Sequence, residues 1–126
     1  MTTASIAQAH YRVALQSRKH AFYADEPEVQ GGTDTAPAPD ELLEAALASC
    51  TAITLRMYAD RKQWPVTSIN VTVQLNRADG KTFFSRDIRC EGEITEEQRQ
   101  RLLQIAKACP VSKTLSGPIE INSTLQ

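Results

Sequence analysis

The chain has 126 residues, of which 41% are hydrophobic and 23% charged, which suits one compact domain and excludes a fibrous or disordered protein. Its formal net charge is -1, with no basic run or acidic tail, so the sequence predicts neither a nucleic-acid partner nor binding to a membrane. The first fifteen residues lack the basic start and apolar run of a secretory signal, and the three cysteines are an odd count. We therefore expect a cytoplasmic protein with reduced thiols.

A β-hairpin is predicted at the start of the chain. Apolar residues alternate with polar ones from Ala9 to Gln16, which is the two-residue period of a half-buried strand. The polar segment 17–19 predicts a turn, and His20 to Ala24 can return antiparallel to the first strand.

A long loop is predicted next. Residues 25–39 concentrate Gly, Pro, Asp and Thr, which disfavour both helix and strand. Loops of this length are often functional, so we expect it to border the site. Pro39, Asp40 and Glu41 then favour the start of a helix, because proline is tolerated there and carboxylates interact well with the helix dipole.

The central helix is predicted from Glu41 to about Lys62. No Gly or Pro interrupts it, and its large apolar residues are distributed around the whole circumference. Glu44 and Arg56 interrupt its apolar character, and it is short for a bilayer span, so we interpret it as a core helix. A chain this short covers such a helix on one side only, which predicts a homodimer that covers the rest.

The second half predicts a further hairpin, a second helix and a last strand. Residues 69–75 alternate as a strand, 78–80 form a turn, and Phe84, Ile88 and Cys90 share one face of the returning strand. Thr95 with Gln98 fits a capping box for the second helix, which is expected to end at Pro110, and residues 119–125 alternate again. This order of elements predicts an α+β fold.

Two cysteines are candidates for chemistry. Cys50 lies in the middle of the central helix, and Cys109 lies where the second helix stops at Cys-Pro. Each has an alternative interpretation as a small buried apolar residue, since free cysteine is among the most buried residue types. Cys90 lies on the apolar face of a strand, where packing explains it.

Other site chemistries find little support in the sequence. No cysteines form a C-x-x-C pair, and His10 and His20 have no metal-ligand spacing to a cysteine, so we expect no metal site. No G-x-S-x-G elbow supports a hydrolase, and Gly31-Gly32 lacks the pattern of a phosphate-binding loop. No bound cofactor is expected.

Two segments together resemble the OsmC/Ohr family of thiol peroxidases. They are P-x-P-D-E-L-L-x-A-A-L-A-S-C-T-A-I-T-L-x-M-Y-A at 37–59 and A-C-P-V-S-K-T-L at 108–115. The stretch 24–39 and the sequence G-P-I-E-I at 117–121 are also similar to that family. The resemblance implies one domain over 1–126 with the OsmC-like fold, two hairpins around a long buried central helix, a second helix, a C-terminal strand and an intertwined dimer.

The resemblance also implies roles for particular residues. The cysteine of the long helix, here Cys50, would attack the peroxide and become a sulfenic acid, and Cys109 would condense with it to give a disulfide. The family uses an arginine to favour the thiolate, for which Arg18 is the first candidate and Arg12 the second. A carboxylate at the helix start holds that arginine, and Asp40 and Glu41 compete for this role.

The expected partners are small molecules. Apolar lining from the helix and from Phe22, Phe83 and Phe84 favours an organic hydroperoxide over hydrogen peroxide, and the resemblance suggests an external lipoyl-type or similar dithiol as reductant. Two alternatives remain open. One is a binding module or stress-associated scaffold with incidental cysteines, and the other is disulfide exchange without peroxidase activity.

Overall fold

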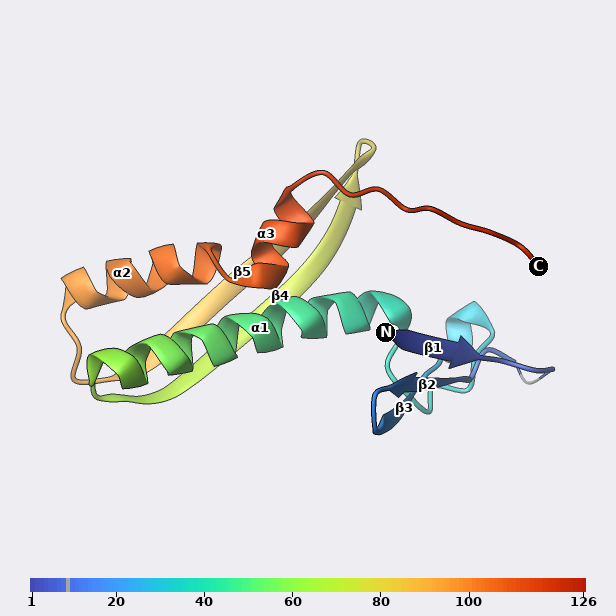
Figure 1. Cartoon of the computed structure of the whole chain (residues 1–126), viewed down its shortest axis with the longest axis horizontal. Coiled ribbons are helices and arrows are strands. Elements are labelled where there is room, and N and C mark those ends of the chain that lie inside the picture. Colours follow the sequence, from blue (N-terminus) through green and yellow to red (C-terminus); the bar gives the residue numbers. More distant parts are fainter. Residues whose placement is uncertain (9) are drawn as a thin grey trace. The chain divides into compact units, whose positions relative to one another are not determined.

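The computed structural model describes residues 1–8 and 10–126 and divides into two compact units, 1–43 and 44–126. Its elements are two small sheets and three α-helices, which confirms the predicted α+β class (Figure 1). The boundary between the units falls inside the central helix, α1 (Pro39–Lys62). The single domain over 1–126 stays a prediction, and each unit is described by itself.

Unit 1 contains a three-stranded antiparallel sheet in the order β1-β2-β3. The strands are β1 (Thr2–Ser5), β2 (Val13–Ser17) and β3 (His20–Ala24). The predicted turn is confirmed, because Ser17 pairs with His20 around two residues, and Arg18 adopts a φ of 52°. The first predicted strand begins later than expected, since Tyr11 turns to a positive φ of 73°; Ala9 lies outside the described residues. β1 was not predicted, because its sequence TTAS is polar and carries no alternation.

The loop after β3 is organised around one carboxylate. Asp25 is only 1% exposed and accepts hydrogen bonds from the hydroxyl groups of Thr33 (2.6 Å) and Thr35 (2.8 Å) and from backbone N–H groups. A short helix, η1 (Glu28–Gln30), lies within the loop. Gly32 packs so closely that a Cβ there would collide with the Glu26 carbonyl, which explains why the loop needs a glycine at this position.

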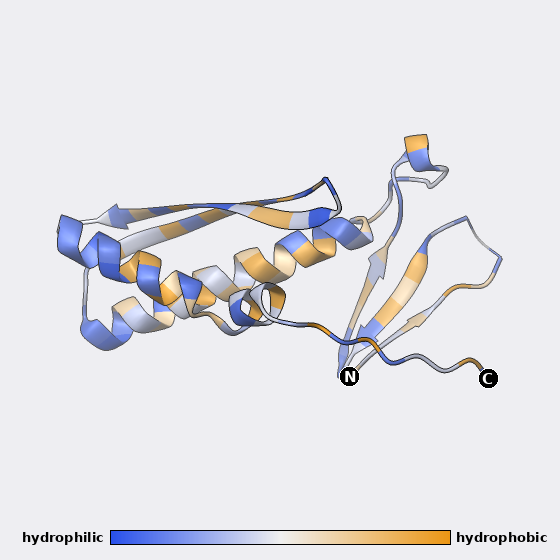
Figure 2. Cartoon of the chain, turned by 90° about the horizontal axis from the view of Figure 1, so that it is seen from above, coloured by the Kyte–Doolittle hydropathy of each residue, from blue (hydrophilic) through white to orange (hydrophobic). Residues whose placement is uncertain are grey.

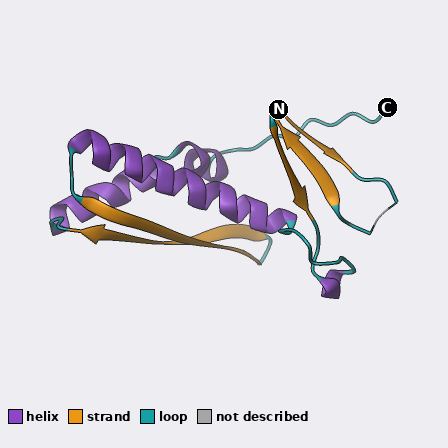
Figure 3. Cartoon of the chain, turned by 90° about the horizontal axis from the view of Figure 1, so that it is seen from below, coloured by secondary structure: helices purple, strands orange, loops and turns teal. Residues whose placement is uncertain are grey.

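Unit 2 has two layers. One is the antiparallel hairpin of β4 (Val66–Ala78) and β5 (Lys81–Gly92), and the other contains α1, α2 (Glu96–Lys107) and α3 (Pro110–Ser116) (Figures 2 and 3). The hairpin turn at Asp79-Gly80 and the capping box of Thr95 with Gln98 are both confirmed.

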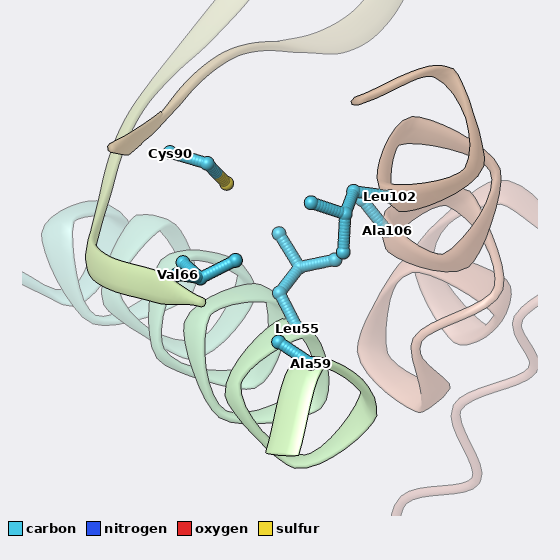
Figure 4. Close-up of a cluster of buried hydrophobic side chains, with 6 residues drawn as sticks. All are labelled: Leu55, Ala59, Val66, Cys90, Leu102 and Ala106. Carbon is cyan, nitrogen blue, oxygen red and sulfur yellow. The ribbon is translucent and has the colours of Figure 1, made fainter. Parts of the chain in front are cut away.

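The core of unit 2 lies between these layers. Leu55 and Ala59 of α1 pack with residues of both strands and of α2, as Figure 4 shows. The buried cluster consists of Leu55, Ala59, Val66, Cys90, Leu102 and Ala106. Burial of apolar area at about 25 cal/mol per Å² makes this cluster the main stabilising feature of the unit.

The C-terminal part differs from the prediction in two ways. α2 ends at Lys107, before the predicted stop at Pro110, and Pro110 begins a helix, α3, that was not predicted; its fixed φ favours the first helical position, and its missing N–H costs nothing there. Residues 119–125 form no strand within the described chain, and Ile121 is 83% exposed. A strand needs hydrogen-bonded neighbours, and alternation alone does not supply an edge to pair with.

The central helix has its predicted bounds, and the single chain covers it on one side only, as expected. Its buried side chains in the single chain form one stripe, Leu47, Thr51, Leu55 and Ala59. Ile53 and Met57, by contrast, are 59% and 58% exposed. α1 is also long and apolar enough, by length and composition, to cross a membrane, a property that core helices of soluble proteins share. One apolar face of α1 therefore lacks a cover in the single chain.

Candidate functional site

The two candidate cysteines come together in unit 2. Cys50 is half-buried on α1, and Cys109 is completely buried at the junction between α2 and α3. The Cys50 side chain acts on the Cys109 thiol, and the hydroxyl of Thr51, the residue after Cys50, lies 3.8 Å from the Cys109 Sγ, although 58 residues lie between the two cysteines in sequence. Both cysteines are free thiols in this structure. Folding thus brings the two cysteines into one site, which a disulfide between them requires.

The backbone fixes Cys109 from both sides. Its N–H donates to the Ala106 carbonyl at 3.2 Å, at the end of α2, and its carbonyl accepts from the Lys113 N–H at 3.0 Å, within α3. Cys109 is the N-cap residue of α3, in an extended conformation. The thiol is therefore held at the positive end of a short helix.

Thr51 connects the Cys109 sulfur to its surroundings. It follows Cys50 on α1 and is completely buried. Its hydroxyl donates to the Leu47 carbonyl at 2.7 Å and lies 3.8 Å from the Cys109 Sγ. A buried hydroxyl needs such partners, because an unpaired one costs about 1–3 kcal/mol.

Arg86 brings a positive charge to the same place. It lies on β5, and its Nη1 donates to the Thr51 Oγ1 at 3.0 Å and to the Ala106 carbonyl at 3.2 Å. Arg86 was not among the predicted site residues. The signal was present, however, because the two-residue alternation of β5 places Arg86 between Phe84 and Ile88 on the inner face.

The pKa of the Cys109 thiol lies below its ordinary value of 9.0. Burial raises it, since the charged form loses solvation, but hydrogen bonds and charge outweigh burial. In decreasing order of weight, these come from the Ser112 N–H, Cys50, Thr51 and Arg86. The site therefore favours a thiolate at Cys109.

Cys90 differs from the other two cysteines. Its side chain points into the apolar cluster, toward Leu55 and Leu102 (Figure 4). Burial raises the pKa of its thiol, and the nearby charges of Arg99 and Arg56 offset this only in part. This confirms the packing interpretation, because a thiol that resists ionisation is a poor nucleophile.

The remaining candidate residues lie in unit 1. Arg18 occupies the exposed turn between β2 and β3, and its carbonyl accepts from Gln16. Arg12 stacks on the Tyr23 ring at 4.1 Å and donates to Thr35 Oγ1 at 2.5 Å. The expected action of either arginine on Cys50 stays a prediction, as does the expected closeness of the loop 25–39 to the site.

The two carboxylates lie in the first turn of α1. Glu41 accepts a hydrogen bond from the Ala38 N–H at 2.9 Å and so stabilises the start of the helix. Asp40 also has an interaction partner. Their expected role in holding an arginine stays a prediction. Among the described residues, no group of three or more His, Cys, Asp or Glu side chains is placed to hold a metal ion.

A hollow lies beside Arg86 on the surface of unit 2. Its volume is about 410 Å³, and it is lined by aromatic and aliphatic side chains together with two cations. Its apolar lining includes Leu47, Phe83, Phe84, Leu103 and Leu115, and its cations are Arg86 and Lys107. Two of the three predicted aromatic residues therefore lie at one hollow, while Phe22 belongs to β3 of unit 1.

The fold is that of a known class of structures. An OsmC-like protein from Mycoplasma pneumoniae superimposes with a TM-score of 0.80 over 93% of this chain and 86% of that one, at 20% identity. The organic hydroperoxide resistance protein OhrB of Bacillus subtilis superimposes with a TM-score of 0.62 over 93% of this chain and 90% of that one, at 23% identity. An organic hydroperoxide resistance protein from Elizabethkingia anophelis superimposes with a TM-score of 0.69 over 94% of this chain and 89% of that one, at 22% identity. No curated protein matches the sequence.

Sequence similarity then identifies the family. The family model described as OsmC-like protein matches residues 32–124, which is most of the chain. The protein therefore belongs to the OsmC-like family.

Proposed function

We propose that this protein is a thiol peroxidase that reduces organic hydroperoxides to alcohols. The observation that carries the proposal is that Cys50 and Cys109 share one site, where the hydroxyl of Thr51, next to Cys50, lies 3.8 Å from the Cys109 Sγ and the surroundings favour a thiolate at Cys109. Family membership supports it, because relatives of the same fold are named organic hydroperoxide resistance proteins.

The proposed reaction uses the two sulfurs in sequence. The Cys50 thiolate attacks one peroxide oxygen, the O–O bond breaks, the alcohol leaves with a proton, and Cys50 becomes a sulfenic acid. The Cys109 thiolate then attacks the Cys50 sulfur and forms the disulfide, and the hydroxide that leaves takes up a proton to become water. An external dithiol, of lipoyl type or similar, reduces this disulfide in two exchange steps and is itself oxidised. The protein supplies no bound cofactor in this scheme.

Single cysteine variants test the proposal. Cys50→Ser and Cys109→Ser should each abolish dithiol-dependent turnover of cumene hydroperoxide, whereas Cys90→Ala, the matched control, should retain it. Turnover that persists in both site variants would contradict the assignment. If the wild-type protein showed no turnover but bound an apolar ligand, with equal affinity in both variants, it would be a binding module. Activity in thiol exchange alone would instead indicate a disulfide exchanger.

The hollow beside Arg86 supports a preference for organic hydroperoxides. Its aromatic side chains Phe83 and Phe84 can contact the apolar group of an organic hydroperoxide, whereas hydrogen peroxide has no such group. The ratio of kcat/KM for cumene or lipid hydroperoxides to that for hydrogen peroxide should therefore exceed one, and a ratio below one would refute the preference.

We also propose that the protein is a homodimer in the cytoplasm and uses neither nucleic acid nor a membrane. The exposed Ile53 and Met57 border an apolar hollow of about 410 Å³ between α1 and β4, and a second copy would cover this face. Two charged groups in the middle of α1 are bonded to the sheet, since Glu44 accepts from the Leu75 N–H and Arg56 donates to the Val66 carbonyl.

Association in solution tests the dimer. Ile53→Glu should shift the sedimentation coefficient from dimer to monomer, and Glu93→Lys, an exposed charge change elsewhere, should not. A wild-type protein that sediments as a monomer at micromolar concentration would refute it, and vesicle binding abolished by Ile53→Glu would assign the face to a membrane.

A further inference from the structure

Arg86 occupies an unusual position for an arginine. It projects from the middle of β5 on the face that otherwise carries Phe84, Ile88 and Cys90 toward the helices. A cation on such a face is unfavourable unless it is paired. No salt bridge to Arg86 occurs within the described chain, and its Nη1 is bonded only to two neutral oxygens. The position lacks an anion.

The Cys109 sulfur is the group that can supply this anion. It lies 3.8 Å from Thr51 Oγ1, which is 3.0 Å from Arg86 Nη1. A guanidinium has only donors, so Thr51 is the acceptor in its contact with Arg86. The single Thr51 hydroxyl proton then has two acceptors in reach, the Leu47 carbonyl and the Cys109 sulfur.

This arrangement can respond to the charge of Cys109. When the sulfur is a neutral thiol, the Thr51 proton bonds to the Leu47 carbonyl, as the 2.7 Å distance indicates. When the sulfur is a thiolate, the same proton can turn to it, because a charged acceptor forms the stronger hydrogen bond. Arg86 supports either orientation by donating to the oxygen.

No carboxylate opposes this arrangement among the groups that act on Cys109. From α1 it meets the Cys50 and Thr51 side chains, from β5 the charge of Arg86, and from α3 the Ser112 N–H. From α2, Lys107 lines the same hollow as Arg86 and is also a cation.

We propose that Arg86 is a positioning residue that acts through Thr51 to hold Cys109 as a thiolate facing Cys50. The inference deepens the proposed function and rests on it only for its effect on turnover. Arg86 is thus expected to set the reactivity of the second thiol of the pair, the one that closes the disulfide. The contacts from Arg86 to Thr51 and from Thr51 to Cys109 are present whether or not the protein reduces peroxides.

The ionisation of Cys109 tests this inference without any peroxide. In a Cys50→Ser/Cys90→Ala background, Cys109 is the single thiol, and the serine introduced on α1 retains a hydroxyl donor. The ultraviolet absorbance of the thiolate then gives the midpoint of its titration. Arg86→Met and Thr51→Val should each raise this midpoint by up to about one pH unit. Arg86→Lys and Thr51→Ser should largely restore it.

A matched control separates electrostatics from folding. Arg89 lies on the exposed face of the same strand, and Arg89→Met should leave the midpoint unchanged. A midpoint that does not move in Arg86→Met, while its thermal unfolding temperature falls, would assign Arg86 a structural role and overturn the inference. If Arg86→Met does not fold, an unmoved midpoint in Thr51→Val would overturn it equally. Loss of turnover with an unmoved midpoint would leave the proposed function standing and refute only the role of Arg86.

Discussion

The two units of the chain are stabilised in different ways. Unit 2 has an apolar core between a hairpin and two helices, centred on Leu55 and Leu102. Among the described residues of unit 1, only Ala24 and Asp25 are buried in the single chain, and the hydrogen bonds of its long loop converge on the Asp25 carboxylate. One unit thus depends on area removed from water, which does not respond to pH. The other depends on a charge, which does.

The largest change in the free energy of unfolding is expected when a cavity is made in the core of unit 2. Leu102 is 3% exposed and its neighbour Leu103 is 43% exposed, on the same helix. Leu102→Ala should lower the free energy of unfolding by about 2–5 kcal/mol, because the truncation removes buried contacts and leaves a cavity. Leu103→Ala, the matched control, should change it by about 0.5 kcal/mol or less. Equal losses in urea unfolding would show that the core is not where the structure places it.

The next largest effect is expected from low pH, which should weaken the loop of unit 1 around Asp25 and leave the apolar core of unit 2 unchanged. Hydrogen bonding, first from the Thr33 hydroxyl, holds the pKa of Asp25 well below its ordinary value of 3.8. Because the folded-state pKa is lowered, the stabilisation is fully present above 3.8 and is lost as the pH falls below it. In the wild-type protein, the amide protons of Thr33 and Thr35 should therefore lose protection from exchange under acid conditions.

Asp25→Asn should remove this pH dependence. The variant should show weak protection of the same amides at neutral pH, with no further loss in acid. Asp34→Asn changes an exposed carboxylate in the same loop and should behave like the wild-type protein. Protection that is independent of pH in the wild-type protein would contradict the role of the charge.

The smallest effect is expected at the start of α2. Thr95 accepts from the Gln98 N–H at 3.1 Å, and the Gln98 side chain accepts from the Thr95 N–H at 2.9 Å. Thr95→Ala should lower the free energy of unfolding of unit 2 by about 1 kcal/mol, since both bonds depend on the cap. Thr82→Ala, at an exposed strand position, should have almost no effect. Chemical denaturation measures both, and equal losses would show that the capping box contributes nothing.

Sequence patterns predicted the periodic elements and missed the others. The alternation of 69–75 and the uninterrupted run of 41–62 specify β4 and α1 because the period itself determines which side chains can be buried. β1 and α3 are short and lack a period, and residues 119–125 alternate without an edge to pair with in the single chain. Local patterns do not report which partner strands are within reach.

The candidate site divides in the same way. Cys50 and Cys109 could be selected from the motifs around them, and the structure brings them together. Arg86 was not predicted although its strand was, because the resemblance implies an arginine without identifying it by a motif, and the candidates, Arg18 and Arg12, belong to the first hairpin. A charged residue on the inner face of a strand needs a partner, and this requirement alone would have indicated a site.

The exposed face of α1 carries a residue that peroxides attack. Met57 is 58% exposed in the single chain, and its thioether is converted to a sulfoxide by the same oxidants that the cysteines are proposed to remove. If Met57 is exposed to solvent, its sulfoxide should accumulate in proportion to the concentration of peroxide. If a second copy of the chain covers it, Met57 should stay reduced. The sulfoxide content of the Met57 peptide, followed by mass spectrometry as the protein is diluted in peroxide, therefore shows how well this face is shielded.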